Sequence, residues 1–181
     1  MLDLGSEDRA GLLATAREAI RARLGHRKPA WPALSPAAAQ PCGAFVTLHK
    51  HGNLRGCIGR MVSSEPLYQV VRDMAVAAAF DDPRFPPLDA SEEPELDLEI
   101  SALSPMESCK PDDVQPGVHG VHLSLGWNSG VFLPQVAPEQ GWDRDQLLHH
   151  LCLKAGLPPG SHRDPGAELK RFTAVVFGER D

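Results

Sequence analysis

The feature that most constrains the fold is a β-hairpin expected near residue 51. Residues 44–49 read as a strand, and residues 54–58 read as a second strand that returns along it. Between them, Lys50-His51-Gly52-Asn53 has the composition of a turn. A hairpin pairs its strands antiparallel, so this segment favours an antiparallel sheet.

Three helices are predicted around this hairpin. Ser6 is expected to cap the first, which should end near Gly25. Ser64 is expected to cap the second, whose apolar residues recur at helical spacing. Asp143 and Gln146 have the spacing of a capping box at the start of the third.

The remaining segments complete an α+β pattern. Apolar and polar residues alternate from 96 to 101, which predicts a strand with one apolar face. A second hairpin is expected over residues 121–133, and a last strand over Leu169 to Phe177. The four prolines of the segment from Pro29 to Pro41 argue against a helix there. Because helices and hairpins follow each other without a βαβ rhythm, we expect an α+β fold with a mainly antiparallel sheet and flanking helices.

Length and composition limit the class of protein. A chain of 181 residues suits one domain over residues 1–181, large enough to fold without disulfides. The net charge of −6 and the lack of a dense basic run disfavour nucleic acid as a partner. No signal-peptide pattern, no membrane-length apolar stretch and no C-x-x-C spacing occur, so a cytoplasmic protein with free thiols and no membrane contact is expected.

Cys57 is the strongest candidate for chemistry. It stands two residues after Arg55, and a nearby guanidinium favours the thiolate, which is the nucleophilic form. Arg55 and Cys57 should share a strand face, and His49 on the partner strand is a candidate base. The alternative is a small buried cysteine that fills a gap beside glycines.

Four further polar residues are candidates for binding, together with Arg55. Asp82 and Arg84 lie in a proline-clamped loop, and Glu99 follows on the next strand. An internal ion pair between Arg84 and either Asp82 or Glu99 is the favoured alternative to a binding role. Gln135 could present its amide to a ligand, or could satisfy buried backbone groups.

Neither a metal nor a cofactor is predicted. The histidines do not follow a known zinc spacing, although His49 and His51 would share a face if the strand reached that far. No glycine-rich phosphate loop occurs, and no cysteine spacing suits an iron–sulfur cluster.

Several motifs resemble one known family. Leu54-Arg55-Gly56-Cys57-Ile58-Gly59 is similar to the signature of the AmmeMemoRadiSam system protein A family, also called the AMMECR-one domain. Matching blocks then follow in order at residues 77–88, 99–104, 130–136 and 152–157, and the resemblance covers roughly residues 8–178. One departure is Ser161-His162-Arg163, where the family usually has an aromatic residue.

The resemblance implies two closely packed α+β subdomains that share a cleft. It also implies a Memo-like protein and a radical S-adenosylmethionine protein as partners, and no established reaction. Two hypotheses follow. The chain is an enzyme or enzyme subunit for a small molecule or a modified side chain, with its site around Leu54–Gly59, or it is a non-catalytic module that binds those partners.

Overall fold

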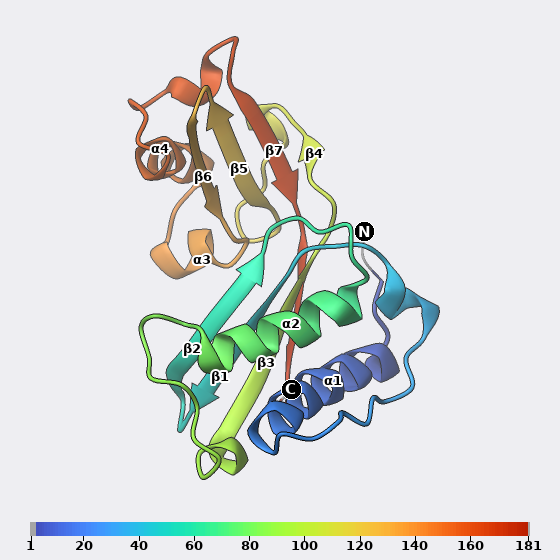
Figure 1. Ribbon diagram of the computed structural model, residues 1–181. Helices are drawn as coiled ribbons and strands as arrows, with labels where there is room; N and C mark the ends of the chain where they lie inside the picture. The colour runs from blue at the N-terminus through green and yellow to red at the C-terminus, as the bar shows by residue number, and fades with distance from the viewer. Residues whose placement is uncertain (1–2, 181) are drawn as a thin grey trace. The chain divides into compact units, whose positions relative to one another are not determined.

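A computed structural model describes residues 3–180, and the chain divides into two compact units. The first holds the described residues up to Leu103 together with those from Val175 onward, and the second holds Ser104–Ala174. Each unit combines a four-stranded sheet with helices (Figure 1). The predicted α+β class with antiparallel sheets is therefore confirmed, whereas the shared cleft stays a prediction.

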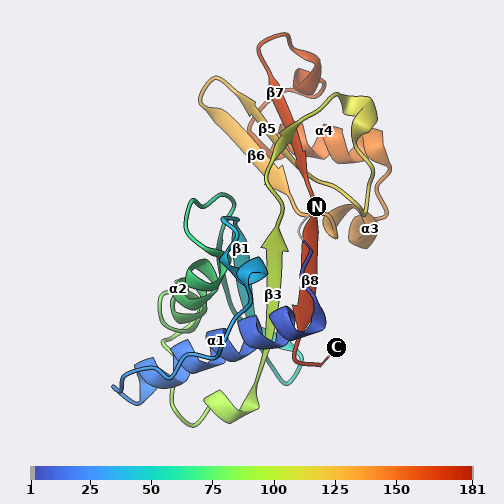
Figure 2. The same cartoon turned by 90° about the vertical axis from the view of Figure 1, so that its right-hand side faces the viewer.

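The sheet of the first unit has the strand order β2-β1-β3-β8. Strand β1 (Ala44–Lys50) pairs antiparallel with both β2 (Asn53–Arg60) and β3 (Leu96–Leu103). Strand β8 (Ala174–Gly178) runs beside β3 in the opposite direction (Figure 2). The sheet thus leaves β2 and β8 at its edges, and an edge strand presents unpaired backbone groups.

The first hairpin turns through only two residues. His51 and Gly52 have φ values of 51° and 80°, the left-handed conformation that a tight two-residue hairpin turn requires. The strands therefore extend further than predicted, to Lys50 and Asn53. His51 lies in the turn and not on the strand, so the possible shared face for His49 and His51 was wrong.

Two helices cover one face of the first sheet. Helix α1 (Ser6–Leu24) packs beside α2 (Leu67–Phe80), and both contact the sheet. Their spacing of apolar residues places one stripe of each helix against the strands. The core residues shared among these helices and the sheet include Leu12, Ala16, Ile20, Val46, Leu48, Val70, Val71, Met74, Leu98, Ile100 and Phe177.

Both predicted N-caps of these helices were wrong by one or two residues. Gly5 caps α1, and the Asp8 carboxylate accepts a hydrogen bond from its N–H at 3.0 Å. Pro66 caps α2, because its fixed φ suits a helix entry and it offers no N–H to satisfy. Gly25 caps the end of α1 as predicted.

The proline-rich connection is ordered by one short turn. Residues Pro36–Ala39 form a 3₁₀ helix, η1, where no helix was predicted. The Ser35 hydroxyl accepts a hydrogen bond from the Ala37 N–H at 3.1 Å, which caps this turn. Ala38 is fully buried in the core, so the connection is held against the first unit.

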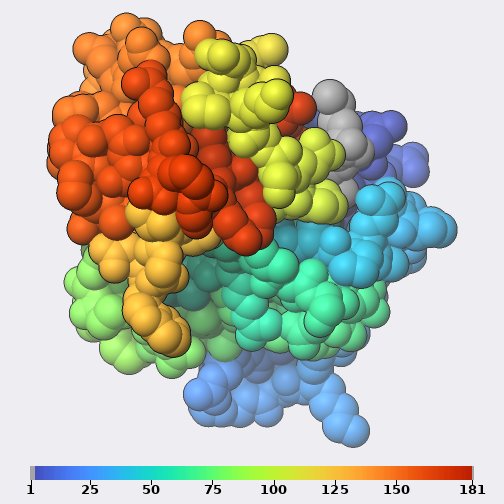
Figure 3. All heavy atoms as spheres, turned by 90° about the horizontal axis from the view of Figure 1, so that it is seen from above, coloured from blue at the N-terminus to red at the C-terminus, as the bar shows by residue number. Residues whose placement is uncertain are grey.

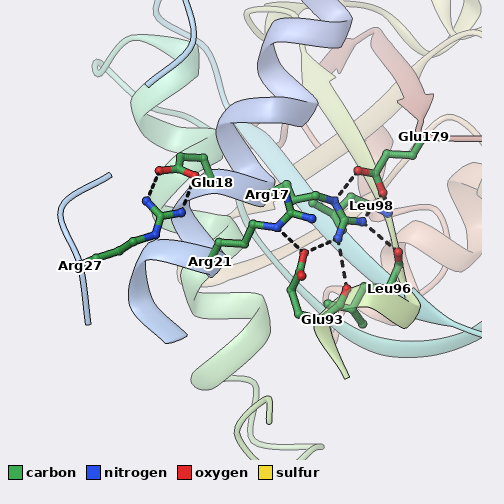
Figure 4. Close-up of polar contacts among 8 residues, drawn as sticks. All are labelled: Arg17, Glu18, Arg21, Arg27, Glu93, Leu96, Leu98 and Glu179. Atoms are coloured by element: carbon green, nitrogen blue, oxygen red, sulfur yellow. Dashed lines mark hydrogen bonds and ion pairs between the residues drawn. The ribbon is translucent and has the colours of Figure 1, made fainter. Parts of the chain in front are cut away.

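An arginine in the middle of α1 joins three segments of the first unit (Figure 4). The Arg17 guanidinium contacts the Glu179 carboxylate at 2.6 Å and the Glu93 carboxylate at 2.6 Å, and it donates to the Leu96 carbonyl at 2.9 Å. Glu179 also accepts a hydrogen bond from the Leu98 N–H at 2.9 Å. These contacts tie α1 to the start of β3 and to the end of β8.

The sheet of the second unit has the order β4-β7-β5-β6, with every pair antiparallel. Its strands are β4 (Glu107–Ser108), β5 (Gly120–Leu125), β6 (Asn128–Phe132) and β7 (Glu168–Phe172). Strand β4 pairs with β7 although the two are far apart in sequence, and the space-filling view shows the yellow segment of the chain against the red one (Figure 3). The predicted second hairpin is confirmed, but its turn is shorter than expected because β6 begins at Asn128.

Helix α4 (Arg144–Lys154) covers strands β5 and β6. Its capping box is present as predicted, since Asp143 Oδ1 accepts from the Gln146 N–H at 2.8 Å and Gln146 Oε1 accepts from the Asp143 N–H at 3.0 Å. A short helix α3 (Val136–Gln140) precedes it and was not predicted, because it spans little more than one turn and contains Pro138. Further 3₁₀ turns are η2 (Glu93–Glu95), η3 (Pro111–Asp113) and η4 (Ser161–Arg163).

The predicted last strand is in fact two strands that belong to different sheets. Strand β7 ends at Phe172 and β8 begins at Ala174. Between them, Thr173 exchanges hydrogen bonds with Ser104, whose N–H donates to the Thr173 carbonyl at 2.8 Å and whose hydroxyl accepts from the Thr173 N–H at 2.9 Å. Apolar residues continue through this junction, so the sequence pattern gave no sign of the break. Over residues 3–180, no helix has the length and apolarity that crossing a membrane would take.

Candidate functional site

Cys57 lies in the edge strand β2 and faces Thr47 on β1. Its N–H donates to Asp82 and its carbonyl accepts from Arg84, so both backbone groups point away from β1. Thr47 and Cys57 therefore form a non-hydrogen-bonded antiparallel pair, in which the two side chains approach most closely. This places the sulfur against the Thr47 side chain on one face of the sheet.

The loop after α2 covers this edge of the sheet with two charged side chains. Asp82 Oδ2 accepts from the Cys57 N–H at 2.9 Å, and Arg84 Nη2 donates to the Cys57 carbonyl at 3.2 Å. The two side chains also bind each other, with Arg84 Nη2 at 2.7 Å and Nε at 3.0 Å from the carboxylate of Asp82. We call Asp82 and Arg84 the edge clamp. The internal ion pair considered from the sequence is thus present, and its acid is Asp82.

The edge clamp is ionised at any physiological pH. Hydrogen bonds from the Arg84 guanidinium, and then from the Cys57 and Arg84 N–H groups, hold the pKa of the Asp82 carboxyl well below its usual range despite its burial. In turn, Asp82 raises the pKa of Arg84. A carboxylate of this kind is too weak a base to shuttle protons near pH 7, so Asp82 positions the backbone rather than transferring protons.

Cys57 is partly buried, as is Cys109, whereas Cys42 and Cys152 are buried. Thr47 Oγ1 donates a hydrogen bond to Cys57 Sγ at 3.3 Å. Arg84 lies so close to Cys57 that a thiolate there would raise the pKa of the Arg84 guanidinium. The Arg84 side chain is about half exposed (53%). A partly buried cysteine with a hydroxyl donor and a nearby cation is an arrangement that suits nucleophilic chemistry.

Glu99 lies in the same row across the sheet. Thr47 is the register partner of both Cys57 and Glu99, so the three side chains share a face. Two such steps across a sheet place Cys57 and Glu99 roughly 10 Å apart at Cβ, too far for a direct hydrogen bond. Among residues 3–180 the Glu99 carboxylate has no hydrogen-bond or ion-pair partner.

His49 lies two residues along β1 from Thr47, opposite Leu54 and Asp97. Within the described chain no hydrogen bond joins His49 to Cys57. The Cys57 sulfur instead accepts a hydrogen bond from the Thr47 hydroxyl. The role of His49 as a base stays a prediction that would need a bridging water or a bound ligand.

The Arg55 side chain does not share a strand face with Cys57 as expected, because β2 has a bulge at Arg55. The register passes from Leu48–Gly56 to His49–Leu54, which leaves Arg55 without a partner on β1. Its guanidinium binds the Glu92 carboxylate through Nε at 3.1 Å and Nη2 at 3.0 Å. The alternation expected from the sequence did not account for this extra residue.

The Arg55–Glu92 pair fixes the loop between α2 and β3. Arg55 Nη2 also donates to the Pro86 carbonyl at 2.9 Å, and its side chain is only 9% exposed. The hydrogen bonds from Arg55 are the largest of several effects that lower the pKa of Glu92 to about 2. The Phe85 ring centre lies 5.8 Å from the guanidinium carbon of Arg55 and 5.5 Å from that of Arg84, within the range of cation–π attraction.

Two glycines of the motif are required by close packing. A Cβ on Gly56 would lie 2.1 Å from the Ala78 carbonyl oxygen of α2. On Gly59, a Cβ would lie 2.2 Å from the Phe45 ring. These distances leave no room for a side chain, so both glycines allow the strand to approach its neighbours.

The other candidates are accounted for as follows. Gln135 precedes α3 in the second unit, is partly buried and makes no side-chain cap to that helix. Its binding role stays a prediction. Sequence reasoning missed Thr47 and Glu92, since neither belongs to a motif and only strand register and loop path bring them to the site. No group of three or more metal-binding side chains gathers anywhere in residues 3–180.

The sequence of this protein is similar to those of several known proteins. A model of the AMMECR1 family matches residues 13–177, so the chain belongs to the AMMECR1 family. It is 44% identical over 144 residues to a protein of Methanothermobacter thermautotrophicus, covering 76% of this chain and 75% of that protein. It is 38% identical to protein TK0174 of Thermococcus kodakarensis, covering 93% and 88% of the two chains.

A solved structure supports the same assignment. The crystal structure of the uncharacterised protein PH0010 from Pyrococcus horikoshii superposes with a TM-score of 0.84 at 35% sequence identity. The match covers 97% of this chain and 93% of that one. None of these relatives carries a name that states an activity.

Proposed function

We propose that the protein is an enzyme, or the subunit of an enzyme, that acts on a small molecule or a modified side chain through the thiol of Cys57. The observation that carries this proposal is the state of the sulfur. Cys57 is only partly buried, and the Thr47 hydroxyl donates to its sulfur at 3.3 Å. A cysteine that only fills a gap is normally sealed and lacks such a donor.

The surrounding charges support the same site. The Arg84 side chain is about half exposed and lies next to Cys57, and Glu99 offers a carboxylate without a partner in the described chain. A ligand of several atoms could reach both groups while its reacting carbon lies at the sulfur. Arg84 would bind an anionic or carbonyl oxygen, and Glu99 would accept from a donor group.

The test uses p-nitrophenyl acetate, a simple acyl donor. Attack by the Cys57 thiolate forms an S–C bond, breaks the ester C–O bond and releases p-nitrophenolate. We expect intact mass and peptide analysis to show one acetyl group on Cys57 before any on Cys109, whose pKa is raised by burial. Cys57→Ala should abolish this early labelling, and Cys109→Ala should retain it. Labelling that ignores Cys57 in the folded protein would overturn the proposal.

A second candidate function is a non-catalytic module that binds a Memo-like or a radical S-adenosylmethionine protein. The observation in its favour is that most of the motif already has a structural task. Gly56 and Gly59 permit close packing, Arg55 holds Glu92, and the edge clamp holds the Cys57 backbone. Under this alternative, Cys57→Ala should bind either purified partner as tightly as the unmodified protein and should lack any chemical phenotype.

A further inference from the structure

A hollow of about 520 Å³ lies in the first unit, away from Cys57. The C-terminal part of α1, the segment after it and the outer side of α2 line it, and these two helices run next to each other (Figure 2). Its volume falls within the usual range of pockets for small ligands. None of the residues that line the hollow belongs to the family motifs.

The lining is basic. Arg23, Arg27 and Arg72 all line the hollow. Glu18 neutralises Arg27 through contacts of 2.7 and 2.9 Å, and Asp73 lies 3.2 Å from Arg72 Nε. Arg23 has no ion-pair partner within residues 3–180, so the hollow keeps an uncompensated positive charge. Such a guanidinium suits a carboxylate or a phosphate, which it can bind through two hydrogen bonds.

An aromatic wall completes the hollow. Trp31 lines it and is 44% exposed, although large aromatic side chains usually bury more of their surface. The guanidinium carbon of Arg72 lies 5.4 Å from the centre of its ring. The indole N–H has no acceptor in the described chain. A planar ligand ring could stack on this indole.

The backbone beside the hollow is strained. His26, which also lines it, has a φ of 46°, a left-handed conformation that is costly for a residue with a Cβ. Gly25, which caps the end of α1, directly precedes His26. Glycine at position 26 would remove this strain, and the imidazole instead adds a polar group to the lining.

We propose that this hollow binds a small anion that carries an aromatic ring. The carboxylate or phosphate of the ligand binds the Arg23 guanidinium, and its ring packs against Trp31. His26 contributes a ring nitrogen at the mouth of the site. This ligand site does not depend on the chemistry proposed for Cys57.

Isothermal titration of the full chain tests the proposal with five probes. Adenosine monophosphate and benzoate combine a ring with a phosphate or a carboxylate. Adenosine and benzyl alcohol keep the rings without the charge, and inorganic phosphate keeps the charge without a ring. We expect adenosine monophosphate, benzoate or both to bind about tenfold more tightly than the uncharged or ringless counterparts. Which of the two binds decides between a phosphate and a carboxylate.

Two variants locate the binding. Arg23→Gln should weaken binding of the anionic probe about tenfold. Trp31→Leu should weaken its binding severalfold and should remove any change in tryptophan fluorescence that the probe causes on binding. Arg163→Gln is the matched control, because Arg163 is also an exposed arginine but lies in the second unit. Thermal melting checks that each variant is folded. The proposal is overturned if neither adenosine monophosphate nor benzoate binds at about 5 mM, if the uncharged probes or inorganic phosphate bind equally well, or if the Arg23 and Trp31 variants bind like the control.

Discussion

Asp82 and Cys57 are joined by a hydrogen bond of 2.9 Å from the backbone N–H of the cysteine to the carboxylate of the aspartate. This contact closes the exposed edge of β2 at the residue that the proposed chemistry depends on. Asp82 is buried, with a side chain only 2% exposed, and its charge is matched by Arg84 at 2.7 Å. The position of the thiol therefore depends on a loop that begins 24 residues later in the chain.

Asp82→Asn should destabilise the first unit by about 2 kcal/mol. The substitution removes the negative charge that Arg84 faces and weakens the acceptor for the Cys57 N–H. Urea unfolding followed by circular dichroism measures the loss. Asp81→Asn is the control, since Asp81 is exposed and its side chain makes no hydrogen bond in the described chain. Equal stability of the two variants would show that the edge clamp contributes little.

Gly56→Ala should cost about 2–3 kcal/mol of unfolding free energy. The new Cβ would lie 2.1 Å from the Ala78 carbonyl oxygen, so β2 and α2 would have to move apart. Gly166→Ala is the matched control, because its Cβ would make only ordinary contacts at 3.4 Å and beyond. Thermal melting of the two variants side by side tests this difference, and a Gly56→Ala melting temperature near that of the control would contradict it.

Arg17→Gln should destabilise the protein by roughly 2 kcal/mol, because it removes the cation that the Glu93 and Glu179 carboxylates share and leaves Glu93 with Arg21 and Glu179 with the Leu98 N–H. The Arg17 side chain is only 17% exposed, so solvent screens these contacts weakly. Arg27→Gln removes a similar two-point pair with Glu18 from an exposed site and should lower the urea midpoint by less than a third as much. Comparable midpoints for the two variants would rule out a special role for Arg17.

The two units should respond differently to mild acid. Burial lowers the pKa of His119, His122 and His162, all in the second unit, below the value of about 6.5 in an unfolded chain. Below that pH the unfolded state binds protons that the folded state does not, so stability falls as the pH drops from about 6.5. The first unit contains carboxylates with lowered pKa, such as Glu92 at about 2, whose contribution is lost only below about pH 4.5.

Amide hydrogen exchange at pH 7.5 and 5.5, corrected for intrinsic rates, measures this difference. We expect protection of β5, β6 and α4 to fall at pH 5.5 while β1 and β3 keep theirs. His122→Leu should reduce the effect, because His122 Nδ1 is buried without a partner, whereas His51→Asn in the exposed turn should leave it unchanged. A uniform loss across both units would contradict the assignment to these histidines.

Local patterns in the sequence predicted the fold class, both hairpins and the main helices. The alternation at 96–101 identified β3, and the Asp143–Gln146 capping box identified the start of α4. The predictions that failed depended on contacts between residues that are distant in the sequence. Thr173 breaks the final strand because Ser104 binds both of its backbone groups, and no residue near Thr173 indicates this.

The sequence motifs marked some residues of the candidate site but not its geometry. The Leu54–Gly59 motif and the proline-clamped loop after α2 drew attention to Cys57, Asp82 and Arg84, which the structure brings together. The bulge at Arg55 turns that residue to Glu92, which no motif marked. Thr47 could be found only from the strand register, since a threonine in a strand is ordinary.

The alkylation rate of Cys57 against pH is the most direct test of the central claim. Iodoacetamide labelling of the folded protein, read by peptide mass spectrometry, compares Cys57 with Cys109 in the same sample. Burial raises the pKa of Cys109 and raises that of Cys42 to about 11, so both should react slowly near pH 7. The account predicts that Cys57 reacts first, at or below pH 7, and that Thr47→Val slows it. If Cys57 stays unlabelled until the protein unfolds, its thiol is a packed core group and the proposed chemistry is wrong.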